Sequence, residues 1–124
     1  MADAVVTGLR VVAIPVTDQD RAIDFYGDVL GFEKTMDGVI DEMSTRWVEM
    51  TPPGSPVSIA LVPAYEGFTA ARDTGIRFTT PDAAALHARI RAAGGHADEL
   101  LQWEGIPPMF DFFDPDGNTL YAMQ

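Results

Sequence analysis

Few side chains in this sequence have the chemistry needed for catalysis or for binding a charged group. There is no cysteine, so disulfides, thiolate metal sites and a cysteine nucleophile are excluded. His87 directly follows an apolar position of a predicted helix and His96 opens a predicted strand, so neither is expected to bind a metal. The sequence has no glycine-rich phosphate loop and no serine at a sharp strand-to-helix turn. The candidates that remain are Glu49, Arg77, Asp111 and Tyr121.

Arg77 and Tyr121 are predicted to share one face of a sheet, because strand alternation puts both on the side away from the helices. A guanidinium in that position needs an anionic partner. The partner could be a carboxylate or phenolate of a ligand, or an internal carboxylate from Glu49 or Asp111. The pattern leaves open which way Glu49 and Asp111 face. Each could transfer a proton inside a cavity, or be a solvated charge.

An internal repeat organises the elements that must position these residues. Residues 11–18 align with residues 75–82, and Gly31 aligns with Gly95, an offset of 64 residues. Each copy begins with a short strand and a helix, for which Thr17 and Thr80 are predicted as N-caps, and each helix ends at glycine. Three strands are predicted after each helix, at about 32–39, 43–50 and 56–62, and at about 96–100, 107–113 and 119–123.

The repeat predicts an α+β fold made of two β-α-β-β-β modules. We expect module 1 to cover about 9–64, a linker about 65–74, and module 2 about 75–124, within a single domain over 1–124. One face of the predicted strands is bulky and apolar, as needed to pack beneath a helix. The other face is small or mixed, which is typical of a surface that lines a cavity.

Two stretches of the sequence resemble a known family. The first contains Ile14-Pro15-Val16-Thr17-Asp18, Arg21-Ala22, Phe25-Tyr26 and Leu30-Gly31-Phe32, and the second is Phe112-Phe113-Asp114-Pro115-Asp116-Gly117-Asn118. They are similar to the first module and the closing hairpin of the vicinal oxygen chelate superfamily, which includes glyoxalase I, extradiol dioxygenases, fosfomycin-resistance enzymes and bleomycin-binding proteins. The resemblance covers nearly the whole chain. It implies a cup-shaped, mostly antiparallel sheet with the helices on the outside, around a small-molecule site.

The resemblance also implies where a metal would bind. Metal-using members of the superfamily carry His or Gln seven residues before the aspartate that opens each helix, and Glu on the last strand of each module. The matching positions here are Val11, Ala60, Gly75 and Tyr121. Three of these have no side-chain donor, and a neutral phenol is a poor ligand for a hard divalent ion. We therefore expect no metal and no other cofactor, which argues against glyoxalase, dioxygenase and metal-dependent transferase activity.

The formal net charge of −11, from 19 acidic residues against 8 Lys and Arg, limits the partners to be expected. Such a surface repels nucleic acids and anionic membranes. It attracts cationic ligands, or it only keeps the protein in solution. No apolar stretch approaches the roughly 20 residues needed to span a bilayer. The N-terminus has no basic leader segment, so a cytoplasmic location is expected.

The predicted ligand site combines an apolar wall with a few polar anchors. Aromatic and thioether side chains suit a small, partly aromatic ligand. Trp103, in a predicted loop near the mouth of the cup, is expected to act as a lid or an interface, and with Phe68 it points to a homodimer. The predicted ligand-binding residues are Val11, Ala13, Trp47, Ala60, Arg77, Trp103, Met109, Phe110 and Tyr121.

Three functions are compatible with this sequence. The preferred one is a metal-free protein that binds a drug or metabolite, as bleomycin-binding members of the superfamily do, because binding needs only a shaped apolar cup and a few anchors. A metal-independent lyase, isomerase or cyclase would use Tyr121, Glu49 or Asp111 for proton transfer. A glyoxalase- or dioxygenase-type enzyme would need unusual metal ligands. The sequence assigns no catalytic residue and does not identify the ligand.

Overall fold

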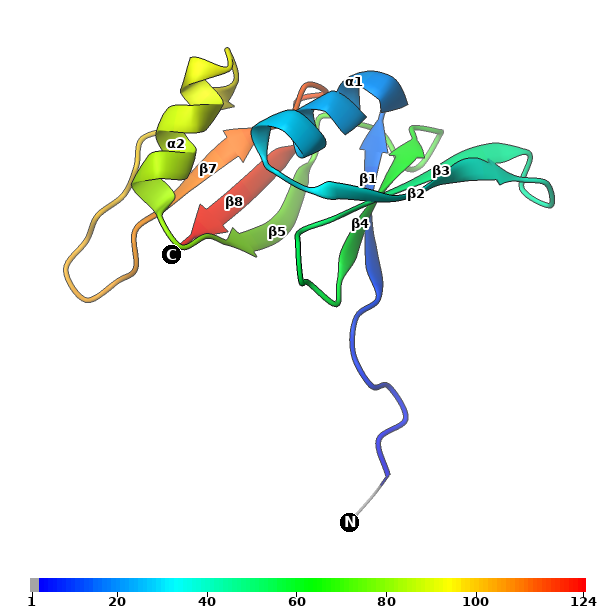
Figure 1. Ribbon diagram of the computed structural model, residues 1–124, viewed down its shortest axis with the longest axis horizontal. Helices are drawn as coiled ribbons and strands as arrows, with labels where there is room; N and C mark the ends of the chain where they lie inside the picture. The colour runs from blue at the N-terminus through cyan, green and yellow to red at the C-terminus, as the bar shows by residue number, and fades with distance from the viewer. Residues whose placement is uncertain (1–2) are drawn as a thin grey trace.

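The computed structural model, which describes residues 3–124, contains the predicted unit twice (Figure 1). The first copy consists of β1 (Val11–Val16), α1 (Gln19–Asp24), a π-helical turn (Phe25–Val29), β2 (Glu33–Ile40), β3 (Thr45–Thr51) and β4 (Ser58–Pro63). The second consists of β5 (Asp73–Thr79), α2 (Ala83–Ala92), β6 (His96–Ala97), β7 (Met109–Phe113) and β8 (Thr119–Met123). The predicted α+β class with two β-α-β-β-β units is confirmed.

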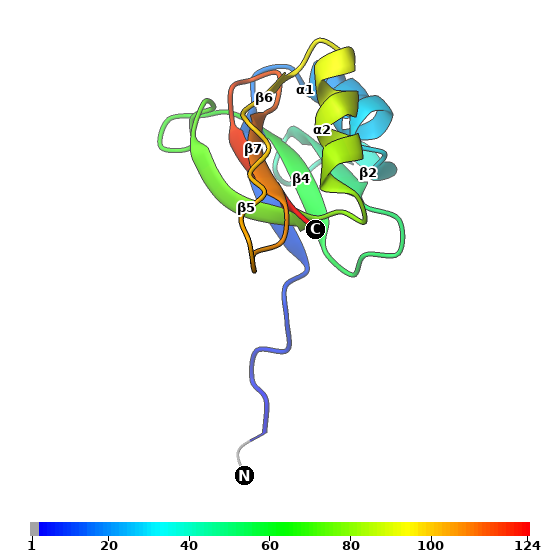
Figure 2. The same cartoon turned by 90° about the vertical axis from the view of Figure 1, so that its left-hand side faces the viewer.

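The strands form two open, four-stranded mixed sheets. Their orders are β1-β4-β3-β2 and β5-β8-β7-β6. β1 is parallel to β4 and β5 is parallel to β8, whereas the other neighbours are antiparallel. Within residues 3–124 no strand pairing joins the two sheets, so β1 and β5 each keep one free edge. Figures 1 and 2 show both helices on the same side of the sheets, while residues 3–10 extend away as an arm.

The helix starts differ from the prediction by one or two residues. The N-caps are Asp18 and Asp82, whose carboxylates accept the backbone N–H of Arg21 and Ala85 at 3.0 Å. The predicted caps Thr17 and Thr80 were wrong, because a carboxylate also interacts favourably with the positive end of the helix dipole. No described helix is long and apolar enough to cross a membrane.

One hydrophobic core serves both halves. The buried apolar residues come from the helix-side faces of both sheets and from the two helices, and they form a single cluster. Phe25, at the end of α1, lies 6.5 Å from Phe112 of β7, measured between ring centroids. Phe32 lies 5.4 Å from Phe78 of β5. Because these contacts cross from one module to the other, neither module has a separate core.

A buried polar network fixes the turn between β7 and β8 to the first module. Asp114 is 5% exposed and accepts the hydroxyl of Tyr26 at 2.9 Å. Asn118, which is completely buried, donates to the backbone carbonyl of Pro15 at 2.8 Å and to Asp114 at 2.9 Å. Asp116 accepts the backbone N–H of Thr17 at 2.9 Å. Burial, and then the charge of Asp114, raises the pKa of the Tyr26 phenol well above its ordinary value, so it remains a neutral donor.

Replacing Tyr26 by phenylalanine tests this network. The change keeps the ring but removes the donor to Asp114, so we expect the free energy of unfolding to fall by about 1–3 kcal/mol. Urea denaturation measures the loss. Tyr65→Phe is the matched control, because Tyr65 is 62% exposed and should change stability by less than about 0.5 kcal/mol. Equal effects of the two changes would contradict a stabilising role for the Tyr26 hydroxyl.

Candidate functional site

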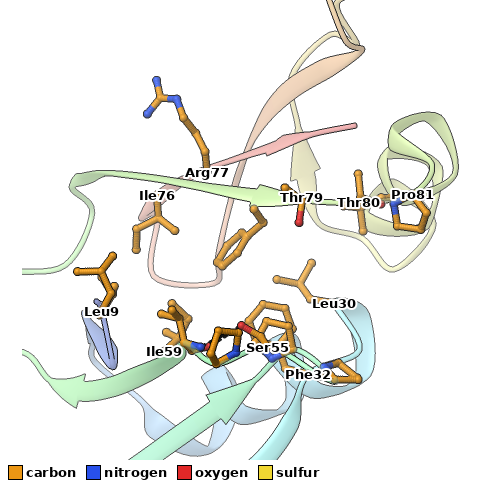
Figure 3. Close-up of a pocket in the computed structure, with 18 of the residues that line it drawn as sticks. Leu9, Leu30, Phe32, Ser55, Ile59, Ile76, Arg77, Thr79, Thr80 and Pro81 are labelled. Atoms are coloured by element: carbon orange, nitrogen blue, oxygen red, sulfur yellow. Dashed lines mark hydrogen bonds between the residues drawn. The ribbon is translucent and has the colours of Figure 1, made fainter. Parts of the chain in front are cut away.

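An apolar cleft of about 860 Å³ separates the two sheets (Figure 3). One wall is formed by Val12 and Ile59, and the opposite wall by Ile76 and Phe78. The remaining lining includes Leu9, Leu30, Phe32, Leu86, Phe112 and the loop of residues 52–57. Of the hydroxyl groups at its rim, those of Ser55 and Thr80 are already bonded to the backbone.

The orientation of the cleft determines where the predicted site residues lie. Its walls are the helix-side faces of both sheets, so these faces look toward each other and the opposite, open faces look away. Figure 3 shows this for β5: Ile76 points into the cleft, whereas Arg77, which borders the cleft, turns its head group away from it. Within one chain, the structure therefore does not bring the predicted ligand residues of the two modules around one space.

The open face of the first sheet carries Val11, Ala13, Trp47 and Glu49. The indole N–H of Trp47 donates to Glu49 at 2.8 Å. Glu49 of β3 pairs with Ala60 of β4, so its side chain lies on the open face. The sequence pattern alone did not decide this orientation. Ala60 lies on the predicted face and is completely buried within one chain.

The open face of the second sheet carries a row of polar side chains. Asp111, Tyr121 and Arg77 are aligned across β7, β8 and β5 by the strand register. The guanidinium of Arg77 lies over the Tyr121 ring, 4.3 Å from its centroid, and donates to the carbonyl of Gly75 at 2.8 Å. The Tyr121 hydroxyl donates to Asp73 at 2.7 Å.

These contacts set the protonation of Asp73 and Tyr121. The Tyr121 hydroxyl and the backbone N–H of Gly75 hold the pKa of Asp73 below its ordinary value. The same hydrogen bond raises the pKa of Tyr121, because ionising the phenol would place a second negative charge beside Asp73. Tyr121 is thus a phenol that donates a proton to a hydrogen bond, rather than a base that accepts one.

The internal salt bridge considered for Arg77 is absent from the described residues. Glu49 accepts the indole N–H of Trp47, and both residues lie on the first sheet, whereas Arg77 lies on the second. Asp111 lies opposite Asp98, whose backbone N–H donates to the Asp111 carbonyl at 2.9 Å. Asp98 in turn lies 2.9 Å from the imidazole of His96.

Four further side chains named in the sequence analysis lie in the second module. Phe110 is 2% exposed, lies on the helix side of β7 rather than on the open face, and packs against Phe112. Met109, one residue earlier, is on the open face and only partly buried. Trp103 is 57% exposed in the loop between β6 and β7 and is not part of the cleft lining. The imidazole of His87 bonds to the Asp98 carbonyl at 2.8 Å.

The residues at the four implied ligand positions do not fit a divalent metal. Val11 and Ala60 have no donor atoms, and Gly75 has no side chain. Tyr121 is a neutral phenol already bonded to Asp73. Within residues 3–124 no three His, Asp or Glu side chains are grouped closely enough to hold a metal ion. The chemistry of this donor set therefore suits an organic ligand better than a metal.

The sequence did not identify two parts of this region. The cleft depends on how the two modules pack, and the strand face that forms most of its walls was expected only to pack beneath a helix. Asp73 was placed in the linker, although it begins β5 and bonds to Tyr121. Gly75 was an available signal, because a glycine inside a predicted strand often marks a bulge. In the structure its φ is +69°, and the strand register shifts between Asp73 and Arg77.

The Asp98–Asp111 pair predicts a pH-dependent contribution to stability. Burial and then Asp98 raise the pKa of Asp111, so the stability contributed by protonating Asp111 is present at acidic pH and lost as the pH rises through this pKa. Asp111→Asn should therefore stabilise the fold near pH 8 by about 0.2–1 kcal/mol, and by less near pH 4. Melting temperatures at both pH values measure this. Asp41→Asn, an equal charge change in the exposed β2–β3 turn, should show no such difference; a similar pH profile for both variants would contradict the pairing.

Comparison with known proteins agrees with this architecture. The family described as Glyoxalase/Bleomycin resistance protein/Dioxygenase superfamily matches residues 8–121. An uncharacterized protein of Shewanella frigidimarina is 46% identical over 44 residues, a match that spans only 33% of that protein and 36% of this chain.

Solved structures are similar over nearly the full length. TnmS3, an antibiotic binding protein from Streptomyces sp. CB03234, is 27% identical, with a TM-score of 0.87 and coverage of 98% of both chains. A superfamily member from Sphaerobacter thermophilus is 29% identical, with a TM-score of 0.86, and the match covers 97% of this chain and 98% of that one. The chain belongs to the Glyoxalase/Bleomycin resistance protein/Dioxygenase superfamily, the vicinal oxygen chelate group that its sequence motifs resemble.

Proposed function

We propose that this protein binds and sequesters a small, partly aromatic molecule in the cytoplasm, without using a metal. The observation that carries the proposal is the donor set: the four positions where the superfamily would hold a metal are Val11, Ala60, Gly75 and a hydrogen-bonded Tyr121. What remains on the open faces is suited to binding an organic ligand. Trp47, Met109 and the Tyr121 ring offer flat or polarisable surface, and Glu49 and Arg77 offer charge.

The similarity to TnmS3 supports binding over catalysis. That protein is described as antibiotic binding, and it matches 98% of this chain at 27% identity. Proton transfer by Tyr121 is disfavoured, because its raised pKa makes the phenolate harder to form. Binding needs no such group, only shape, apolar area and a few anchors.

A thermal-stability screen tests the proposal. The purified protein is screened against aromatic antibiotics and metabolites, with zinc, nickel and iron(II) as separate arms. A ligand at 100 times its dissociation constant should add about 2.7 kcal/mol to the free energy of unfolding. We expect stabilisation by at least one aromatic compound and none by the metals, and elemental analysis should find no stoichiometric metal. Near one equivalent of metal, or stabilisation by metals alone, would contradict the proposal.

The ligand site is completed by a second copy of the chain. β1 and β5 are equivalent strands of the repeat, and each has a free edge beside the cleft. A twofold-related copy can place its β5 along β1 of this chain. The open face of this chain's first sheet then lies beside the open face of the copy's second sheet. The same copy covers the apolar cleft and the arm, whose Val5, Val6 and Leu9 are 95%, 83% and 71% exposed.

Sedimentation of the wild-type protein at micromolar concentration should therefore give twice the chain mass of 13.4 kDa. Leu9→Asp should raise the dissociation constant of the dimer about tenfold or more, because a carboxylate would be buried in an apolar interface. Val39→Asp is the matched control, since Val39 is 68% exposed on β2, away from the cleft. A wild-type species of 13.4 kDa alone would show that the cleft is not a dimer interface.

A further inference from the structure

Arg77 is held firmly but has no carboxylate partner. The ring of Tyr121 supports one face of the guanidinium at 4.3 Å, and the carbonyl of Gly75 accepts one of its N–H groups at 2.8 Å. No acidic group lies within salt-bridge distance of Arg77 among residues 3–124. Among the same residues Arg10, Arg72, Arg89 and Arg91 also have no acidic partner, and Arg77 is exposed. What sets Arg77 apart is its place on the open face, over the Tyr121 ring and near Asp73.

The nearby carboxylate of Asp73 bonds to other donors. Asp73 accepts the Tyr121 hydroxyl at 2.7 Å through one oxygen and the Gly75 backbone N–H at 3.0 Å through the other. Each oxygen thus accepts a donor other than Arg77, while Arg77 donates to the carbonyl of Gly75. The positive φ of Gly75, +69°, lets its N–H face Asp73 while its carbonyl faces Arg77.

The remaining donors of Arg77 point toward the open face. A guanidinium has five N–H donors in a planar fork, and the protein uses one of them here. A flat head group supported from one side leaves an edge that can bond a carboxylate through two parallel hydrogen bonds. Such charge-assisted bonds are short, directional and stronger than those to a neutral group.

We infer that Arg77 anchors an anionic oxygen group of the ligand, an aromatic carboxylate or phenolate, and that Asp73, Gly75 and Tyr121 are positioning residues for it. The inference rests on the proposed binding function and adds the chemical class of the ligand. The net charge of −11 repels anions in general. An anion therefore binds only where its hydrogen bonds to Arg77 outweigh that repulsion. The ring of Tyr121 supports the Arg77 guanidinium, and the Tyr121 hydroxyl donates to Asp73. Tyr121 therefore donates no hydrogen bond to the ligand.

Three isosteric probes test the ligand class: 1-naphthoate, 1-naphthamide and 1-naphthylmethylamine, titrated by NMR. The wild-type protein should bind the carboxylate about tenfold more tightly than the neutral amide, and the amine least. Arg77→Met should remove the preference for the carboxylate. Arg72→Met is the matched control, because Arg72 also lies over an aromatic ring, Phe68 at 4.8 Å, and donates to a backbone carbonyl. It should leave the preference unchanged.

Two more variants test the positioning role. Tyr121→Phe keeps the ring but releases Asp73, whose carboxylate can then pair with Arg77, so naphthoate binding should weaken about tenfold. Adding Asp73→Asn should restore it, which loss of folding or packing would not do. Equal binding of naphthoate and naphthamide by the wild-type protein, or a preference that survives Arg77→Met, would overturn the inference and leave the binding function standing. Failure of all three probes, together with a blank wider screen, would overturn both.

Discussion

The carboxylate of Asp114 controls how the two halves of the molecule are set against each other. It is buried, and it accepts the hydroxyl of Tyr26 from the first module and the amide of Asn118 from its own turn. A buried carboxylate is tolerated only when its oxygens are satisfied, so the turn can dock in essentially one way. Once it docks, the helix-side faces of the two sheets are brought against one core.

That arrangement decides which surfaces are available for function. With the helix-side faces turned inward, the open faces of both sheets are turned outward, and the cleft between the modules is apolar. The structure therefore separates two tasks. In the function proposed above, the cleft and the free edges of β1 and β5 serve association, whereas the charged and aromatic groups of the open faces recognise the ligand.

The sequence predicted the features that depend on local pattern. The repeat appeared as an offset of 64 residues, and the strands and helices of each copy followed from periods of two and 3.6 residues. The period of two also put Arg77 and Tyr121 on one face, and the two residues are paired in the structure. Phe110 was misplaced because it was grouped with Met109, although adjacent residues of a strand face opposite ways. The cleft and the Asp73–Tyr121 bond were not predictable, because they depend on the packing of modules and on a bulge whose register no local pattern shows.

The bulge at Gly75 also affects how this chain could change over evolution. A side chain added there would meet no other atom within 4 Å, so space alone would permit a histidine at this position. The backbone would not, because a φ of +69° costs most residues about 1–2 kcal/mol. A side chain at this position would relieve that strain only if the strand straightened, which would move the carbonyl that accepts Arg77 and the N–H that donates to Asp73. A side-chain ligand at position 75 and the present setting of Arg77 therefore require different backbone conformations.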